Sequence, residues 1–178
     1  KSQHFYPPDF LCFERLRQIL SALGEWNVLL ALFERAAESA ADPDVRIERY
    51  SDAALVAEEI AEDPERAIAL HEKALVGAPN HEPSLIALEK LYTRMEQWDR
   101  LGAVLDRRLS AAIGDDAPQL RRKLGLLRLR ALKDARGALP LLALVLEDSP
   151  DDQEVLDEVF ALLANADLRR PAATALEP

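Results

Sequence analysis

The chain has 178 residues, of which 49% are hydrophobic and 30% charged, and its 32 acidic against 22 basic residues give a formal net charge of -10. That charge excludes a general nucleic-acid binder, which would need a basic face for phosphates. No apolar run approaches the ~20 residues of a membrane-spanning helix. The single cysteine, Cys12, excludes an internal disulfide and a cage of cysteine ligands for a metal. We expect a cytoplasmic protein without a membrane segment, and the first residue, Lys1 rather than Met, is expected of a fragment or a processed chain.

Residues 1–8 lack a helical pattern, and we expect an extended arm there. The rest of the chain alternates stretches of helical periodicity with short breaks of turn-forming residues, and no strand pattern interrupts them. The pattern predicts helices over 9–22, 25–38, 45–61, 64–77, 82–95, 98–112, 117–132, 135–148 and 152–164, and a short last helix over 167–176.

The clearest of these helices lies between Asp63 and Asn80. Asp63 can cap its first turn, and Pro64 suits the first helical position because the missing N–H would be unpaired there. Pro79 disfavours helical geometry in the residue before it and so ends the helix. Helical spacing predicts a buried face made of Ala67, Ile68, Leu70, His71, Ala74 and Leu75.

The pattern repeats along the chain. The two tryptophans, Trp26 and Trp98, are 98 − 26 = 72 residues apart, which is about twice the ~34-residue tetratricopeptide period. The segment from Asp134 to Ala138 repeats the segment from Asp63 to Ala67 at a distance of 138 − 67 = 71 residues. These spacings indicate a double repeat, in which a hairpin of the Trp type precedes a hairpin of the Asp type.

These features resemble the tetratricopeptide repeat family, in the form found in long bacterial repeat proteins. The resemblance covers nearly the whole chain and is best from Asp63 to Tyr92. It implies an all-α solenoid, a right-handed superhelix of about five hairpins over 9–38, 45–77, 82–112, 117–148 and 152–176. Pro140 departs from the pattern, since proline inside a helix removes a hydrogen bond and clashes with the preceding turn. We expect that helix to begin near Ala138 or to kink at the proline.

In this family the first helices of the hairpins line a concave binding surface, and the resemblance implies which side chains face it. The predicted partner-binding residues on first helices are Ser51, Leu55, Ile86, Lys90, Arg122 and Leu126, and Arg130 is added because it belongs to a basic cluster.

The basic cluster lies on one hairpin of an otherwise acidic chain. Its members are Arg121, Arg122, Lys123, Arg128, Arg130, Lys133 and Arg136. One interpretation is a set of ion pairs between neighbouring repeats, each worth ~0–1 kcal/mol if exposed. The other is a site for an acidic peptide or partner, or self-association of the two ends of the chain head to tail.

The sequence offers no catalytic motif. His4, His71 and His81 form no pair with metal-ligand spacing, and at His71 packing is favoured over catalysis. No glycine-rich phosphate loop and no nucleophile elbow is present. We therefore expect a non-catalytic scaffold, without cofactor or metal, that binds a protein or peptide partner. The alternatives are an architectural spacer within a larger repeat protein, and an α-helical enzyme or ligand-binding bundle, which would need a closed pocket.

Overall fold

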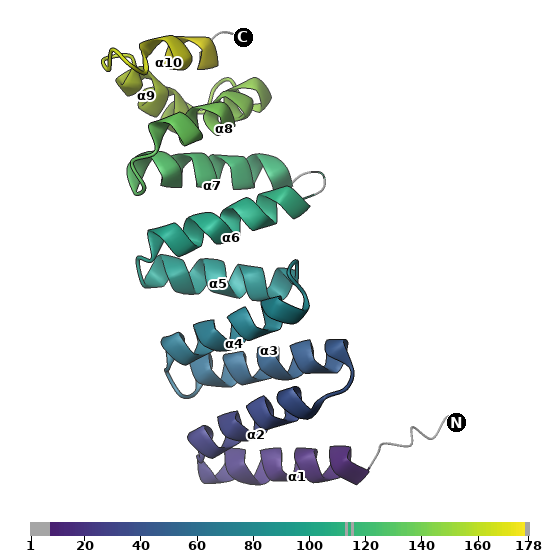
Figure 1. Cartoon of the computed structure of the whole chain (residues 1–178). Helices are drawn as coiled ribbons and strands as arrows, with labels where there is room; N and C mark the ends of the chain where they lie inside the picture. Colours follow the sequence, from purple (N-terminus) through teal and green to yellow (C-terminus); the bar gives the residue numbers. More distant parts are fainter. Residues whose placement is uncertain (1–7, 113, 115, 177–178) are drawn as a thin grey trace. The chain divides into compact units, whose positions relative to one another are not determined.

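The computed structural model describes residues 8–112, 114 and 116–176, with side chains from Arg15 onward. Every regular element in these residues is an α-helix, which confirms the all-α prediction (Figure 1). Each helix begins and ends within two residues of its predicted bounds. The helices are α1 (Pro8–Leu23), α2 (Trp26–Ser39), α3 (Pro43–Glu59), α4 (Pro64–Gly77), α5 (Glu82–Arg94), α6 (Trp98–Ala111), α7 (Asp116–Arg130), α8 (Ala135–Asp148), α9 (Gln153–Leu162) and α10 (Arg169–Ala175).

Pro8 belongs to the first helix rather than to the predicted arm, because proline at a helix start loses no hydrogen bond. The rest of the predicted arm, residues 1–7, lies outside the described residues, as does the side chain of Cys12. Among the residues that the structure describes, no helix has the length and hydropathy needed to cross a bilayer.

The chain forms two compact units, Lys1–Ser84 and Leu85–Pro178, and the division falls within α5. In the first unit α2 packs on α1 and α3, and α3 packs on α4. In the second unit α7 packs on α6 and α8, while α10 packs on α8 and α9. Apart from α10, which also packs on α8, the helices in contact within each unit follow one another in sequence, as expected of helical hairpins (Figure 1).

Small side chains carry the contact between α3 and α4. Ala53, Ala54 and Ala57 of α3 are completely buried, which lets the two backbones approach closely. The buried residues of α4 are the six that the sequence predicted: Ala67, Ile68, Leu70, His71, Ala74 and Leu75.

The second helices of the first four hairpins begin in two ways, which alternate along the chain as the double repeat predicts. Asp63 and Asp134 begin α4 and α8, and each side chain accepts a hydrogen bond from the backbone N–H three residues later. In contrast, α2 and α6 begin at Trp26 and Trp98 and have no capping side-chain hydrogen bond. The two kinds of hairpin therefore differ in structure as well as in sequence.

The turns from the first to the second helix share one feature in the first four hairpins. In each of these turns one residue has a positive φ, between 53° and 71°, and the next backbone N–H donates to a carbonyl near the end of the first helix at 2.8 to 3.0 Å. Only the first turn uses glycine, which adopts this conformation without strain. The four residues are Gly24, Glu62, Glu96 and Lys133.

Pro140 does not delay the start of its helix. The expected start near Ala138 is wrong, because α8 begins at Ala135 and holds the proline in its interior. The Asp134 cap fixes the first turn ahead of the proline. In addition, Arg128 of α7 donates a hydrogen bond of 3.1 Å to the carbonyl of Gly137, which lies in the turn that the proline disturbs.

Candidate partner-binding surface

On α3, Leu55 is exposed between buried neighbours. Its side chain is 51% exposed, whereas Ala54 and Ala57 are completely buried. Ser51, one helical turn before Leu55, is half-buried, and its hydroxyl oxygen is buried without a hydrogen-bond partner among the described residues. Helix α3 therefore presents a large aliphatic side chain to solvent.

On α5, Ile86 and Lys90 are both exposed and lie four residues apart, so they share one face of the helix. The opposite side carries Leu85 and Leu88, which are buried. Ile86 is 37% exposed. The second unit thus presents an aliphatic side chain next to a cation.

On α7, Leu126 is not on the surface. It is only 8% exposed and belongs to a core cluster with Leu139 and Leu142 of α8. The two helices approach closely because α7 has glycine at position 125, where a Cβ atom would lie 2.6 Å from Leu142 Cδ2. A partner cannot reach Leu126 in this arrangement.

Arg122 and Arg130 are exposed in part, but their guanidinium groups bind carboxylates near the start of α9. Arg122 donates to Asp152 at 2.6 Å and also contacts Glu154. Arg130 donates to Glu154 at 2.6 Å and to Glu158 at 2.7 Å. The two arginines therefore form a ladder of ion pairs that ties α7 to α9.

The ladder changes the protonation equilibria of its members. Hydrogen bonds to Asp152 and Glu154 raise the pKa of Arg122, and the Arg122 hydrogen bond lowers the pKa of Asp152. Hydrogen bonds from Arg130 and Arg122 likewise lower the pKa of Glu154. Asp152 also caps α9 by accepting from the Val155 N–H, so one carboxylate joins a helix start to the ladder.

Three more cations of the basic cluster are paired with carboxylates of other helices. Of the two interpretations of this cluster, ion pairs between neighbouring helices are what the structure contains. The pairs are Arg121 with Asp148, Lys123 with Glu89, and Arg128 with Asp106.

The first unit has a smaller ionic contact that the sequence did not reveal. Glu34 of α2 accepts hydrogen bonds of 2.9 Å from both Arg66 and Lys73 of α4. Burial raises the pKa of Glu34, but the hydrogen bonds from Lys73 and Arg66 outweigh this effect and lower it. The partners lie more than 30 residues apart, so no local pattern in the sequence could indicate them.

A buried polar network joins α4 to the start of α5. The His71 Nδ1 lies 3.2 Å from the Ser84 hydroxyl, and the His81 Nδ1 lies 2.8 Å from the same oxygen. Both His71 and Ser84 are buried, which confirms the expected packing role of His71. Burial, together with the charge of His81, lowers the pKa of His71 to about 4, so this imidazole is neutral near pH 7.

Within the described part of the chain, no group of three or more His, Cys, Asp or Glu side chains is placed to hold a metal ion. Among the large apolar side chains that the structure shows as exposed are Leu55 of α3 and Ile86 of α5, which can contact another molecule.

The helical hairpins and their exposed first helices define a helical-repeat protein. Residues 84–119, which span most of α5, all of α6 and the start of α7, match the sequence profile of the tetratricopeptide repeat. No protein with a curated description matches the sequence.

Solved structures share the fold at low sequence identity. The structure described as the MamA RS-1 ArsTM double mutant is 17% identical, with a TM-score of 0.54, and the alignment covers 95% of this chain and 91% of that one. A putative kinesin light chain with nearly identical TPR-like repeats, from Podosopora anserina, is 15% identical, with a TM-score of 0.50 and coverages of 99% and 94%. YrrB, described as a TPR protein with an unusual peptide-binding site, is 21% identical with a TM-score of 0.49, and the alignment covers 72% of this chain and 66% of that one.

Residues 84–119 therefore resemble a tetratricopeptide repeat, and the described helices share the fold of these structural neighbours.

Proposed function

We propose that the chain is a non-catalytic scaffold that binds a protein or peptide partner through first helices, with one contact on α3 in the first unit and another on α5 in the second. The observation that carries the proposal is the exposure of Leu55 and Ile86, large aliphatic side chains at first-helix positions whose helical neighbours are buried. Exposed apolar side chains of this kind are typical of interaction sites when polar groups surround them. Lys90, beside Ile86, supplies such a polar group on α5.

The proposal assigns a smaller role to α7 than the sequence predicted. Leu126 is buried, and the ladder with α9 already occupies Arg122 and Arg130. Binding an acidic partner there would mean displacing Asp152, Glu154 and Glu158 from their cations. We therefore place partner contacts on Leu55, Ile86 and Lys90, and leave out Ser51 because its hydroxyl oxygen is buried.

The test is capture of partners from the native source with the purified chain and two variants, Leu55→Glu and Ile86→Glu. We expect the wild-type chain to retain a specific partner, and each variant to lose it because the carboxylate would be buried at the contact. The matched control is Val76→Glu, since Val76 is also aliphatic and is 85% exposed on α4, a second helix. Equal capture by all four chains would exclude the proposed surface.

The second candidate function is an architectural spacer within a larger repeat protein. The ion-pair ladder favours it, because cations of the most basic hairpin are paired within the chain rather than open to a ligand. A spacer would retain no specific partner in the capture experiment.

A further inference from the structure

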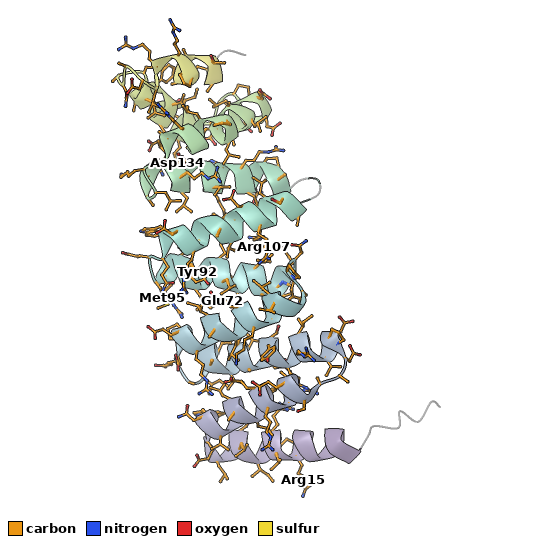
Figure 2. All side chains as sticks on the ribbon, in the orientation of Figure 1. Arg15, Glu72, Tyr92, Met95, Arg107 and Asp134 are labelled. Carbon is orange, nitrogen blue, oxygen red and sulfur yellow. The ribbon has the colours of Figure 1, made fainter. Side chains whose placement is uncertain are left out.

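The outer face of α3 carries a stripe of exposed or partly exposed side chains along the whole helix. Its members recur every three or four residues, which places them on one side of the helix. The opposite side is buried and faces the helices that pack on α3, which are α2 and α4. The side chains of α3 can be followed in Figure 2. The five residues of this α3 stripe are Val45, Glu48, Asp52, Leu55 and Glu59.

The α3 stripe is acidic, and its charge is not neutralised within the chain. Glu48 and Glu59 are exposed, and neither carboxylate has an ion-pair partner among the described residues. Asp52 lies 3.8 Å from the guanidinium of Arg49, whose side chain is only 13% exposed. The other arginine of the helix, Arg46, donates a hydrogen bond to a backbone carbonyl that precedes the helix. Two carboxylates of the stripe are therefore open to a cation from another molecule.

The corresponding side of α7 shows the contrasting case, in which the charges are paired within the chain. At the repeat distance of 71 residues, Glu59 corresponds to Arg130 (130 − 59 = 71) and Leu55 to Leu126 (126 − 55 = 71). Arg130 donates hydrogen bonds to two carboxylates of α9, and Leu126 is 8% exposed, whereas Leu55 is 51% exposed. Equivalent positions thus form an internal contact on α7 and an exposed surface on α3.

An occupant of the α3 stripe has to match both its charge and its apolar side chains. Leu55 lies between Asp52 and Glu59 in the stripe, and Val45, which is 37% exposed, precedes Glu48. Carboxylates and aliphatic side chains therefore share about 21 Å of helix, since each residue adds about 1.5 Å. Complementary charge favours Lys or Arg side chains, and apolar contact favours aliphatic ones. A metal ion would use the carboxylates but leave Leu55 exposed.

We propose that the α3 stripe binds a basic, partly apolar peptide segment of a protein partner. Lys or Arg side chains of the segment pair with Glu48 and Glu59, and an aliphatic side chain between them packs on Leu55. This inference rests on the proposed function, because it names the kind of partner that the α3 contact takes. It concerns the first unit alone, since Ile86 and Lys90 belong to the second.

The probe for this contact is a phage-displayed library of random peptides long enough to span the α3 stripe. The purified 178-residue chain selects binders from it. We expect the selected sequences to be enriched in Lys and Arg and to carry an aliphatic residue between two cations. The affinity of one selected peptide, made synthetically, is then measured by fluorescence anisotropy. It should fall as salt is added, because exposed ion pairs are screened.

The decisive variant is Glu48→Gln/Glu59→Arg, which gives α3 the residues found at the equivalent positions of α7, Gln119 (119 − 48 = 71) and Arg130. Because α7 carries these residues in the same kind of helix, the variant should fold, which circular dichroism checks. We expect its affinity for the selected peptide to be lower by about tenfold or more, since two ion pairs are lost and a like charge is introduced. A peptide in which Glu replaces each Lys and Arg should bind this variant better than it binds the wild-type chain.

The matched control is Glu65→Gln/Glu147→Arg, which makes the same change of charge at exposed positions of α4 and α8 and should bind the peptide like the wild type. A second variant, Leu55→Gln, tests the proposed function separately, because it removes the aliphatic contact and leaves every carboxylate in place.

The outcomes separate this inference from the proposed function. A loss of binding in Leu55→Gln but not in Glu48→Gln/Glu59→Arg would overturn the basic partner and leave the α3 contact standing. Binding unchanged in both variants would overturn the α3 contact as well. A library that yields no binders enriched in Lys and Arg also overturns the inference.

Discussion

The junction between α4 and the start of α5 in the first unit is equivalent to the junction between α8 and the start of α9 in the second. The repeat of 71 residues relates His71 to Leu142 (142 − 71 = 71) and Ser84 to Val155 (155 − 84 = 71). In the first unit this pair is polar and joined by a hydrogen bond, whereas in the second it is aliphatic. All four side chains are buried. The same helical architecture therefore accepts a polar pair in the core as long as its hydrogen bonds are made.

The polar pair and the aliphatic pair have different neighbours. Next to the polar pair, the His81 ring also lies within hydrogen-bond distance of the Ser84 hydroxyl. The aliphatic pair needs close approach of α7 and α8, and glycine stands at position 125, where the first unit has Ala54 (125 − 54 = 71). Each unit contains one tryptophan, Trp26 or Trp98, so the two units can be followed separately by fluorescence.

The largest expected effect comes from truncating a buried side chain at the aliphatic junction between α8 and α9. Leu142→Ala should lower the free energy of unfolding of the second unit by about 3 kcal/mol, because Leu142 is completely buried and its loss leaves a cavity. The change in the free energy of unfolding is measured by Trp98 fluorescence during urea unfolding, in a chain that also carries Trp26→Phe. Val76→Ala, at an exposed site in the first unit, is the control. A loss below about 1 kcal/mol would mean that the junction collapses around the missing side chain.

The polar junction should make the first unit sensitive to acid. His71 has a folded-state pKa of about 4, below its ordinary value of 6.5, so the unfolded state takes up the proton first. The contribution of neutral His71 to the free energy of unfolding of the first unit is fully present above about pH 6.5 and is lost as the pH falls towards the folded-state pKa. We expect a loss of up to about 2 kcal/mol between about pH 7.5 and about pH 5, followed through Trp26 in a Trp98→Phe background.

The control for this pH dependence converts one junction into the other. The double variant His71→Leu/Ser84→Val should lose the acid sensitivity between pH 7.5 and pH 5, since no buried imidazole remains there. If the double variant keeps the full wild-type slope, the sensitivity arises elsewhere in the first unit.

The close approach of α7 and α8 gives a smaller effect. Gly125→Ala should destabilise the second unit by about 1–2 kcal/mol, because the added Cβ would meet Leu142 at 2.6 Å while helix propensity returns part of the loss. Adding Leu142→Val to the same chain should recover stability relative to Gly125→Ala alone. If the losses of unfolding free energy from the two substitutions simply add in the double variant, the added Cβ atom does not clash with Leu142.

The smallest expected effect concerns the ladder between α7 and α9. Arg130→Gln should cost less than about 1 kcal/mol, because the pairs with Glu154 and Glu158 are partly exposed and screened by salt. The cost should shrink further in high salt. A loss of several kcal/mol that salt does not change would mean that the ladder behaves as a buried network.

The parts of the fold that the sequence predicts are those with local causes. The bounds of α4 follow from Asp63, Pro64 and Pro79, and the buried face of the helix follows from its periodicity. Pro140 shows the limit of local reasoning: it lies inside α8, which begins at the Asp134 cap, and the nearby Gly137 carbonyl accepts a hydrogen bond from Arg128 of another helix.

The candidate site was harder to predict for the same reason. The resemblance to a repeat family indicates first-helix positions, and at Leu55 and Ile86 the side chains are exposed, but the burial of Leu126 depends on how closely two helices approach. Similarly, the spacing of Arg122 and Arg130 indicates a charged face, while their carboxylate partners lie 24 to 32 residues away in sequence.

The most direct test of the scaffold function is site-specific photo-crosslinking in cells that make the protein. A photoreactive amino acid would replace Leu55, Ile86 or, as control, Val76, in separate chains. We expect a distinct adduct with a specific partner from position 55 and from position 86, each in its own unit, and no such adduct from position 76. Identical adduct patterns at all three positions, or no adduct at positions 55 and 86, would contradict the proposal that α3 and α5 each contact a partner.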